Sequence, residues 1–292
     1  MTEQALTHDR REIGRTGKSV FPIGLGGMPL SIQNRPSEAE AIRVIHASLE
    51  AGVDFIDTAN VYCLDDSDIG HNEALIAKAI KQAKRPVFVA TKGGLRRPKG
   101  DWTNDARPEF LRLSCEQSLR ALGVDRIFLY QLHAPDPKII FTDSVGALAA
   151  LKTEGKIEHI GLSNVTIEQL RAALKVVRIE SVQNRINPFD GRDYTNGMIE
   201  FCEKEGISFL PHSPVGGHTG HARLKSSGLF EKLEQKYGCS RYVVVLAWHL
   251  SKGARLIPIP GASKITSATD SPRAASIRLE PSDIALIDRG SF

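Results

Sequence analysis

One pattern constrains the fold of this chain more than any other: a short apolar run followed by a longer amphipathic segment, repeated eight times. A short apolar run is typical of a buried strand, and apolar residues three and four positions apart are typical of a helix. Their regular alternation indicates β-α units around a parallel sheet. The expected strands are residues 20–23, 53–56, 87–90, 127–130, 157–162, 181–183, 207–210 and 256–258.

The clearest of the expected helices covers residues 37–51. Its apolar residues recur at helical spacing, Ser37 precedes them, and Glu40 follows three residues later, which is the pattern of a capping box. The remaining helices are expected over residues 72–83, 108–122, 143–153, 167–175, 196–205 and 241–251.

Eight β-α units in 292 residues match the number and size of a (β/α)8 TIM barrel. We therefore expect an α/β fold in a single domain, residues 1–292, with a short β-hairpin at residues 11–21 ahead of the barrel. A doubly wound sheet is the alternative, because Gly24-Leu25-Gly26-Gly27 begins like a dinucleotide-binding fingerprint. The third glycine of that fingerprint is replaced by Pro29, so the barrel is preferred. The long connection at residues 211–241 indicates an excursion with a function or flexibility of its own.

The composition excludes several classes of protein. Hydrophobic residues make up 41% and charged residues 25%, as in a globular protein rather than a disordered one. No apolar run is long enough to span a membrane, and residues 1–11 lack the apolar centre of a secretion signal, so we expect a cytoplasmic protein with no membrane partner. The net charge of +4 is spread over 38 basic and 34 acidic residues, so nucleic acid is not an expected partner. The four cysteines form no C-x-x-C pair and are expected to be reduced thiols.

Polar residues at the ends of three consecutive strands carry the chemistry, because a TIM barrel builds its active site at the carboxyl ends of its strands. Asp57 ends the second strand, with Tyr62 shortly after it, Lys92 ends the third, and His133 follows the fourth. A nearby ammonium lowers the pKa of a phenol, a carboxylate fixes that ammonium, and a neutral imidazole can orient a carbonyl by hydrogen bonding. Each residue alone is more often structural, as half of an ion pair or a packed ring. The combination favours catalysis.

The segments that contain these four residues resemble the catalytic segments of the aldo-keto reductase superfamily. They are Asp57-Thr58-Ala59-Asn60-Val61-Tyr62, Thr91-Lys92 and Gln131-Leu132-His133-Ala134-Pro135-Asp136-Pro137, and the resemblance extends over nearly the whole chain. It implies a TIM barrel, a nicotinamide cofactor that is usually NADPH, with NADH as the alternative, and reversible reduction of aldehydes or ketones. It also implies that Tyr62 is the general acid, that Lys92 lowers the pKa of Tyr62, that Asp57 pairs with Lys92, and that His133 orients the carbonyl.

The resemblance extends to the cofactor contacts. Ser163 and Asn164, after the fifth strand, and Gln183, at the end of the sixth, correspond to residues that hold the nicotinamide carboxamide in relatives. An amide needs a matched donor and acceptor, which Asn164 and Gln183 supply. The alternative is that Ser163 and Asn164 cap the helix that follows. The cofactor contacts that the resemblance implies are Gly27, Met28, Asp57, Ser163, Asn164, Gln183, His212, Ser213, Pro214, Gly216, Gly261, Ser263, Lys264, Ser267, Asp270 and Ser271.

Two of these regions depart from the family pattern. Many relatives place an aromatic residue where this chain has His212, and an imidazole offers less stacking surface and can become charged, which changes cofactor affinity or its pH dependence. In the region for the adenosine phosphate, Asp270-Ser271 stands for an acidic-Asn pair, and Ser267 stands where Arg or Gln is usual. Lys264 is then the best remaining ligand for a 2′-phosphate, with Arg273 as the alternative.

The expected substrate pocket is lined by Met28, Tyr62, Trp102, His133 and His218, and residues 216–223 form part of its rim. Trp102 could equally be a packed loop aromatic, and Met28 a core residue of the barrel mouth. We expect no metal site, because His218 and His221 have no carboxylate or thiol at ligand spacing, and Gly217 and Gly220 indicate a mobile loop.

The expected substrate is a small carbonyl compound. Residues 160–166 and 211–217 resemble a bacterial branch that includes pyridoxal reductases, so pyridoxal is the leading candidate, followed by sugar-derived or generic aldehydes. A rival of another class is a cofactor-bound regulatory or binding protein with little turnover, and the intact set of four catalytic residues argues against it. A monomer or a weak homo-oligomer is expected.

Overall fold

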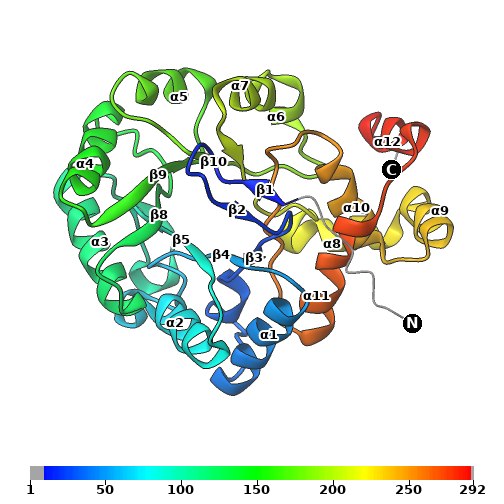
Figure 1. Ribbon diagram of the computed structural model, residues 1–292, viewed down its shortest axis with the longest axis horizontal. Coiled ribbons are helices and arrows are strands. Elements are labelled where there is room, and N and C mark those ends of the chain that lie inside the picture. The colour runs from blue at the N-terminus through cyan, green and yellow to red at the C-terminus, as the bar shows by residue number, and fades with distance from the viewer. Residues whose placement is uncertain (1–9, 291–292) are drawn as a thin grey trace.

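The structure is a computed structural model that describes residues 10–290, with the side chains of residues 218 and 219 left aside (Figure 1). Residues 1–9, where no secretion signal is expected, and the side chain of His218 therefore lie outside the described part of the chain. No helix within residues 10–290 combines the length and the apolar character that crossing a membrane requires.

A curled parallel sheet of seven strands forms the centre of the molecule, surrounded by helices (Figure 1). Each strand pairs in register with its neighbour, for example Asp57 with Ala90 and Lys92 with Gln131. The strand order is β11 (Ser208–Phe209), β10 (Ser181–Gln183), β9 (Ile157–Ser163), β8 (Ile127–Leu132), β5 (Phe88–Gly93), β4 (Phe55–Asp57) and β3 (Leu25–Gly26).

The segment at residues 256–261 closes the sheet into a barrel. Ile257 N–H donates to the Phe209 carbonyl (2.9 Å) on one side, and the Pro260 carbonyl accepts from Gly26 N–H (2.9 Å) on the other. The segment forms isolated parallel bridges rather than a regular eighth strand. The reason is local, because Pro258 and Pro260 have no N–H to donate toward β3. The expected (β/α)8 barrel is thus confirmed, with an irregular last strand.

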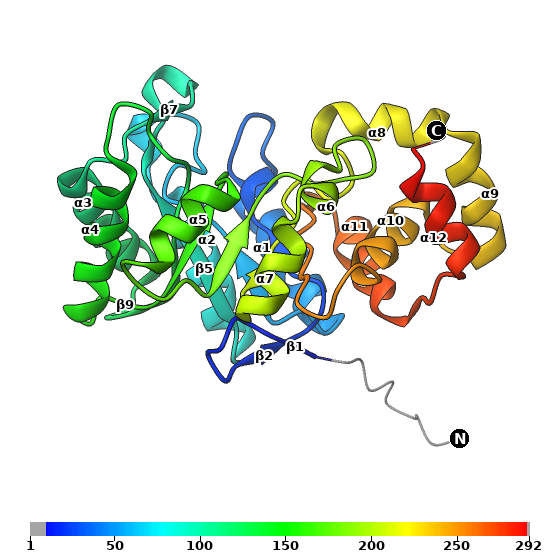
Figure 2. The ribbon, with the colours of Figure 1, turned by 90° about the horizontal axis from the view of Figure 1, so that it is seen from above.

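The beginning of the barrel differs from expectation. Residues 20–23 are not the first barrel strand: Val20 belongs to the hairpin strand β2 (Ser19–Val20), which pairs antiparallel with β1 (Arg11–Glu12), and the barrel starts at β3. Pro22 interrupts the run, because it has no N–H for a ladder. The expected hairpin is confirmed and lies at the opposite end of the barrel from α8 (Gly217–Ser226), as Figure 2 shows.

The helices follow the expected pattern closely. The first, α1 (Glu38–Glu50), has the expected capping box between Ser37 and Glu40. The others that the sequence predicts are α2 (His71–Ala83), α3 (Pro108–Leu122), α4 (Phe141–Thr153), α5 (Ile167–Leu174), α7 (Met198–Glu205) and α10 (Arg241–Leu250). Shorter or unexpected ones are α6 (Arg192–Thr195), α8, α9 (Gly228–Tyr237), α11 (Ile265–Asp270) and α12 (Pro281–Asp288).

The connection at residues 211–241 is not a loop without secondary structure, because it contains α8 and α9. Gly216 and Gly217 turn the chain into α8 with φ angles of 93° and 61°, a region that favours glycine. A Cβ on Gly216 would lie 2.6 Å from the Cα of Gly220, so the glycines allow close packing of this first turn. The excursion is therefore largely helical and lies beside the carboxyl ends of the strands.

Candidate active site

The polar residues of the site stand one layer above an apolar core inside the barrel. Phe55, Ala90 and Leu129 belong to one buried cluster, from β4, β5 and β8. Two positions further along the same strands are Asp57, Lys92 and Gln131. Because residues two apart in a strand share a face, these polar side chains point into the barrel at the carboxyl ends of the strands.

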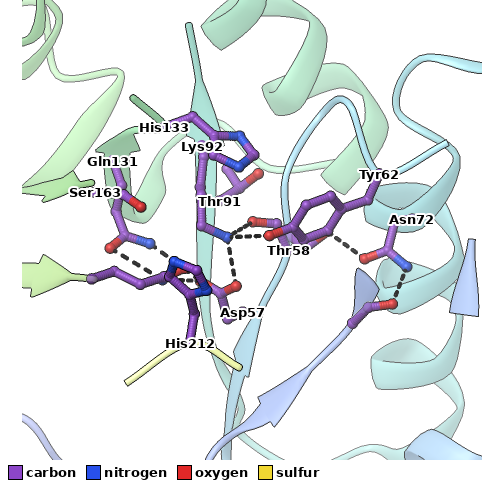
Figure 3. A network of polar contacts seen from close by, with 12 residues as sticks. Asp57, Thr58, Tyr62, Asn72, Thr91, Lys92, Gln131, His133, Ser163 and His212 are labelled. Atoms are coloured by element: carbon purple, nitrogen blue, oxygen red, sulfur yellow. Dashed lines mark hydrogen bonds and ion pairs between the residues drawn. The ribbon is translucent and has the colours of Figure 1, made fainter. Parts of the chain in front are cut away.

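Lys92 is the centre of the site. Its side chain is completely buried, and its ammonium donates to Asp57 Oδ2 (2.5 Å), the Thr58 carbonyl oxygen (2.9 Å) and Tyr62 Oη (2.9 Å), as Figure 3 shows. Each of the three ammonium protons therefore has an acceptor. The structure brings together the acid, amine and phenol that the sequence places on separate segments.

The second oxygen of Asp57 is held by two amides. Asp57 Oδ1 accepts from Gln183 Nε2 (2.7 Å) and from Gln131 Nε2 (3.2 Å), and Gln131 in turn accepts from Ser181 Oγ (3.2 Å). Sequence reasoning gave Gln131 no role. Its signal was its place at the end of the fourth apolar run, the same signal that identified Asp57 and Lys92.

His133 follows β8 and faces Tyr62. The two rings meet edge to face, with centroids 5.7 Å apart and planes at 83°. His133 Nδ1 is buried with no hydrogen-bond partner among the described residues. Burial, with smaller contributions from the Lys92 charge and from His212, holds the pKa of His133 well below its usual value. The imidazole is therefore neutral at physiological pH.

The pKa of Tyr62 differs from the sequence expectation. Lys92 does act to lower it, but burial acts in the opposite direction and is larger, so the pKa of Tyr62 lies above its usual value. For Lys92, burial acts to lower the pKa, while Asp57 and Tyr62 together outweigh it and raise the pKa. Both groups consequently keep their protons at neutral pH.

One cavity of about 600 Å³ joins these residues to the expected cofactor contacts. It runs from Tyr62 and His133 along the carboxyl ends of the strands to Ser267 in α11. The expected residues that line it are Met28, Asp57, Tyr62, Trp102, His133, Ser163, Asn164, Gln183, His212, Ser213, Pro214, Gly261, Ser263 and Ser267. Three further lining residues, Val215, Gly217 and His221, belong to the segments 210–217 and 216–223 that the sequence places at the cofactor and at the pocket rim. The lining residues that sequence reasoning missed are Gly26, Pro29, Ile32, Leu95 and Ile259.

Some expected cofactor residues lie outside the lining of the cavity: Gly27, Gly216, Lys264, Asp270 and Ser271. Asp270 instead accepts hydrogen bonds from Ser240 and from Arg273 Nη1 (3.0 Å). Arg273, the alternative phosphate ligand, is therefore occupied by an ion pair. Lys264 is exposed and immediately precedes α11.

Asn164 adopts a left-handed conformation (φ 58°) that its own contacts maintain. Its Nδ2 donates to the His133 carbonyl oxygen (2.9 Å) and to Ser163 Oγ (3.1 Å), and its N–H donates to the Gln183 carbonyl (3.0 Å). The alternative that Ser163 and Asn164 cap the next helix is wrong, because Thr166 caps α5 and forms a capping box with Gln169. The pair is free to serve the cavity.

His212 lies at the cavity wall beside Asn164. Its Nε2 is 3.3 Å from Asn164 Oδ1, and its Nδ1 is 3.3 Å from Ser213 Oγ. Burial and the Lys92 charge lower the pKa of His212 to about 4. The ring is therefore neutral across the physiological range, rather than a group that charges readily.

Trp102 forms the opposite wall of the cavity. It is 45% exposed, and its ring centroid lies 6.3 Å from those of both Tyr62 and His133. The guanidinium of Arg97 covers the indole ring, 3.8 Å from its centroid. Trp102 is thus a rim residue of the cavity rather than a packed core aromatic. Among the described side chains, which do not include that of His218, no group of three or more His, Cys, Asp or Glu residues could hold a metal ion.

The chain resembles known proteins over nearly its whole length. The model of the Aldo/keto reductase family matches residues 22–290. An uncharacterised oxidoreductase of Schizosaccharomyces pombe is 33% identical over 271 residues, which cover 91% of this chain and 85% of the relative. A probable aldo-keto reductase of Glycine max is 31% identical over 303 residues, covering 94% and 86%. The crystal structure of a thermostable aldo-keto reductase with the inhibitor epalrestat superimposes with a TM-score of 0.81 at 27% identity, covering 97% of this chain and 99% of that one.

Proposed function

Because the chain belongs to the aldo/keto reductase family, we propose that it reduces an aldehyde or ketone to an alcohol, reversibly and with NADP(H), and that Tyr62 supplies the proton. One observation carries the proposal. At the floor of a cavity, the completely buried Lys92 contacts both the Asp57 carboxylate and the Tyr62 hydroxyl. A protein with no use for a proton donor has no reason to bury this ion pair against a phenol, since burying charges is costly.

The cavity suits a nicotinamide dinucleotide. Its 600 Å³ lies within the range of roughly 300–1,000 Å³ for cofactor and ligand sites. Ser163, Asn164 and Gln183 offer hydroxyl and amide groups in the cavity lining, where Gln183 contacts Asp57 and Asn164 contacts the His133 carbonyl. These groups match the donor and acceptor of a carboxamide. The far end, at Ser263 and Ser267, is the proposed phosphate end, with Lys264 as its nearest cation in sequence and NADH as the alternative cofactor. NADP(H), when bound, supplies the hydride for the carbonyl carbon and takes it back in the reverse direction.

Each of the four proposed catalytic residues has its own role in the transfer of one proton. Tyr62 donates its hydroxyl proton to the carbonyl oxygen, and the Lys92 ammonium, 2.9 Å from Tyr62 Oη, stabilises the phenolate that remains. Asp57 keeps Lys92 charged and in place. The neutral His133 donates an N–H to the same carbonyl oxygen and fixes its direction toward Tyr62.

For the substrate, we propose a planar aldehyde. Tyr62, Trp102 and His133 place three rings around the reacting end of the cavity, and such a wall favours a flat ring over a flexible polar chain. Pyridoxal is the leading candidate, with generic aromatic aldehydes next and sugar-derived aldehydes last. The ratios of kcat/KM across these three classes decide between them.

The test of the proposed function is NADPH consumption by the purified protein with a panel of aldehydes and ketones, repeated with NADH. We expect steady turnover with NADPH and the highest kcat/KM for planar aldehydes. Absence of consumption of either cofactor across the panel, combined with tight cofactor binding, would instead favour the regulatory alternative.

A further inference from the structure

Two residues in the first turn of α2, Asn72 and Glu73, accept hydrogen bonds from the two strand ends that carry the Asp57–Lys92 ion pair. These two hydrogen bonds form the grip of α2 on the strands. Asn72 Oδ1 accepts from Thr58 Oγ1 (2.6 Å), and Thr58 follows Asp57 directly. Glu73 Oε1 accepts from Thr91 Oγ1 (2.5 Å), and Thr91 precedes Lys92 directly. Two consecutive helix residues thus each hold the neighbour of one member of the pair.

This grip lies on the outer face of the sheet, behind the active site. Side chains alternate between the two faces of a strand, so Thr91 points toward the helices while Lys92 points into the barrel. Thr58, Asn72, Thr91 and Glu73 are all completely buried. None of the four lines the cavity, and Figure 3 shows Thr58 and Asn72 beyond the ion pair.

Thr58 connects the helix to the reacting groups directly. Its hydroxyl is held by Asn72, and its carbonyl oxygen accepts from Lys92 Nζ (2.9 Å). Its N–H donates to the Ala90 carbonyl on the neighbouring strand (2.8 Å). A shift of Thr58 would therefore move one of the three acceptors that fix the Lys92 ammonium.

Asn72 also contacts the two residues on either side of a turn that lines the cavity. Its Nδ2 donates to the Gly27 carbonyl oxygen (2.9 Å) and to Ser31 Oγ (2.7 Å). Gly27 and Ser31 flank the short turn Met28–Leu30, which contributes Met28 to the cavity lining. A Cβ on Gly27 would lie 2.5 Å from Asn72 Oδ1, so glycine is what permits this close approach.

Glu73 is buried without an oppositely charged partner among the described residues. No ion pair involves it within the part of the chain that the structure describes, and its Oε2 has no hydrogen-bond partner there. Burial raises the pKa of Glu73 to about 7, against the Thr91 hydrogen bond, the nearby Ser118 hydroxyl and the charge of Lys92. The other titratable groups that act with it are Cys115 of α3 and Tyr130 of β8. The hydrogen bond from Thr91 to Glu73 Oε1 is thus the polar contact that the buried position of Glu73 provides.

We propose that Asn72 and Glu73 are positioning residues, which hold Asp57 and Lys92 in register with Tyr62 by gripping Thr58 and Thr91. This inference rests on the proposed function, because the aligned groups are those assigned to proton transfer. Neither residue touches the reacting atoms. The competing account is that the two hydrogen bonds only pack α2 against the sheet.

The test replaces the hydroxyl groups of Thr58 and Thr91, which donate to Asn72 and Glu73, by methyl groups of similar size. In the double variant Thr58→Val/Thr91→Val, we expect kcat to fall about 10- to 100-fold, because small misplacements of catalytic groups cost that much. KM for the aldehyde and Kd for NADPH stay within about threefold, since the cavity lining is untouched. The control is Ser144→Ala, in α4 and away from the site. This variant removes a buried hydrogen bond from Ser144 Oγ to the Ala106 carbonyl oxygen (2.6 Å).

A second pair of variants tests Glu73 by rescue. Glu73→Leu removes the acceptor for Thr91, and we expect a loss of kcat similar to that of Thr91→Val. Glu73→Gln retains an acceptor oxygen and should recover most of that loss. A purely structural role predicts instead that kcat follows the melting temperature in all variants, Ser144→Ala included, and that result would overturn the proposal.

A structural readout separates this proposal from the proposed function. In a crystal structure of the double valine variant, we expect the contact between Lys92 Nζ and Tyr62 Oη, 2.9 Å here, to lengthen beyond hydrogen-bonding distance. An unchanged contact refutes the positioning role. If the wild-type protein shows no turnover, the proposed function fails, while this distance still decides whether Asn72 and Glu73 align the pair.

Discussion

The two ends of the cavity are built differently. At the proposed catalytic end, Asp57, Lys92 and Tyr62 are buried and joined by hydrogen bonds. At the proposed phosphate end, Ser263 and Lys264 are exposed, and the expected ligands Asp270 and Arg273 are paired with each other. The difference teaches that the proposed catalytic groups hold one another in place inside the barrel, while the proposed phosphate ligands are surface side chains with few fixed contacts.

The largest effect is expected at the catalytic end. Lys92→Met removes the cation beside Tyr62 and leaves Asp57 buried without its partner. We expect kcat to fall by about 1,000-fold or more, and the free energy of unfolding to fall by about 3–5 kcal/mol. Kinetics and urea unfolding measure the two effects. The double variant Lys92→Met/Asp57→Asn should regain part of the stability but none of the activity, and recovered activity would refute the role of the pair.

The second-largest effect tests the burial of Glu73, behind the proposed catalytic end. The pKa of Glu73 is raised from 4.5 to about 7, so between these values the folded state binds more protons than the unfolded state. Stability that this group contributes is present at low pH and lost as the pH rises through 7. Relative to Glu73→Gln, the wild type should therefore lose about 3 kcal/mol of unfolding free energy between pH 5 and pH 8. A constant difference between the two proteins would mean that Glu73 is not buried as described.

A smaller effect is expected at the phosphate end. Lys264 is exposed, so its contribution to binding a phosphate is limited by solvent. Lys264→Ala should weaken NADPH binding about fivefold, corresponding to about 1 kcal/mol, and leave NADH binding and kcat unchanged. Fluorescence titration with both cofactors measures this. Equal weakening of NADPH and NADH would show that Lys264 does not contact a 2′-phosphate.

The smallest effect concerns His212, which lies between the two ends. Because burial and Lys92 lower the pKa of His212 to about 4, the ring stays neutral between pH 5.5 and pH 8. The ratio of the NADPH Kd values of the wild type and His212→Phe should then be the same, within about twofold, at both pH values. A ratio that changes as the pH falls would indicate a charged imidazole at the cavity wall.

The catalytic end could be predicted from the sequence because strand geometry encodes it. A period of two and a shared strand end suffice to bring Asp57 and Lys92 together, and the same rule would have found Gln131. The barrel and most helices follow from equally local patterns. The expected first strand is wrong because Pro22 has no backbone N–H to donate to a neighbouring strand. The last strand is irregular because Pro258 and Pro260 lack the same donor.

The rest of the site depends on contacts between elements, which no short-range pattern records. The grip of Asn72 and Glu73 on two strands arises from the packing of α2, not from the sequence around the strands. Leu95 and Val215 reach the cavity because of the paths of their loops. At the proposed phosphate end, Arg273 pairs with Asp270, a contact that only the folded structure reveals.

The most direct test of the central claim is the rate of a single turnover in Tyr62→Phe, with enzyme saturated by NADPH and by the best aldehyde. This variant removes only the hydroxyl that Lys92 contacts. If Tyr62 is the proton donor, NADPH oxidation in that turnover will be slower by about 100-fold or more than in the wild type, with NADPH affinity unchanged. An equal rate in the two proteins would contradict the account.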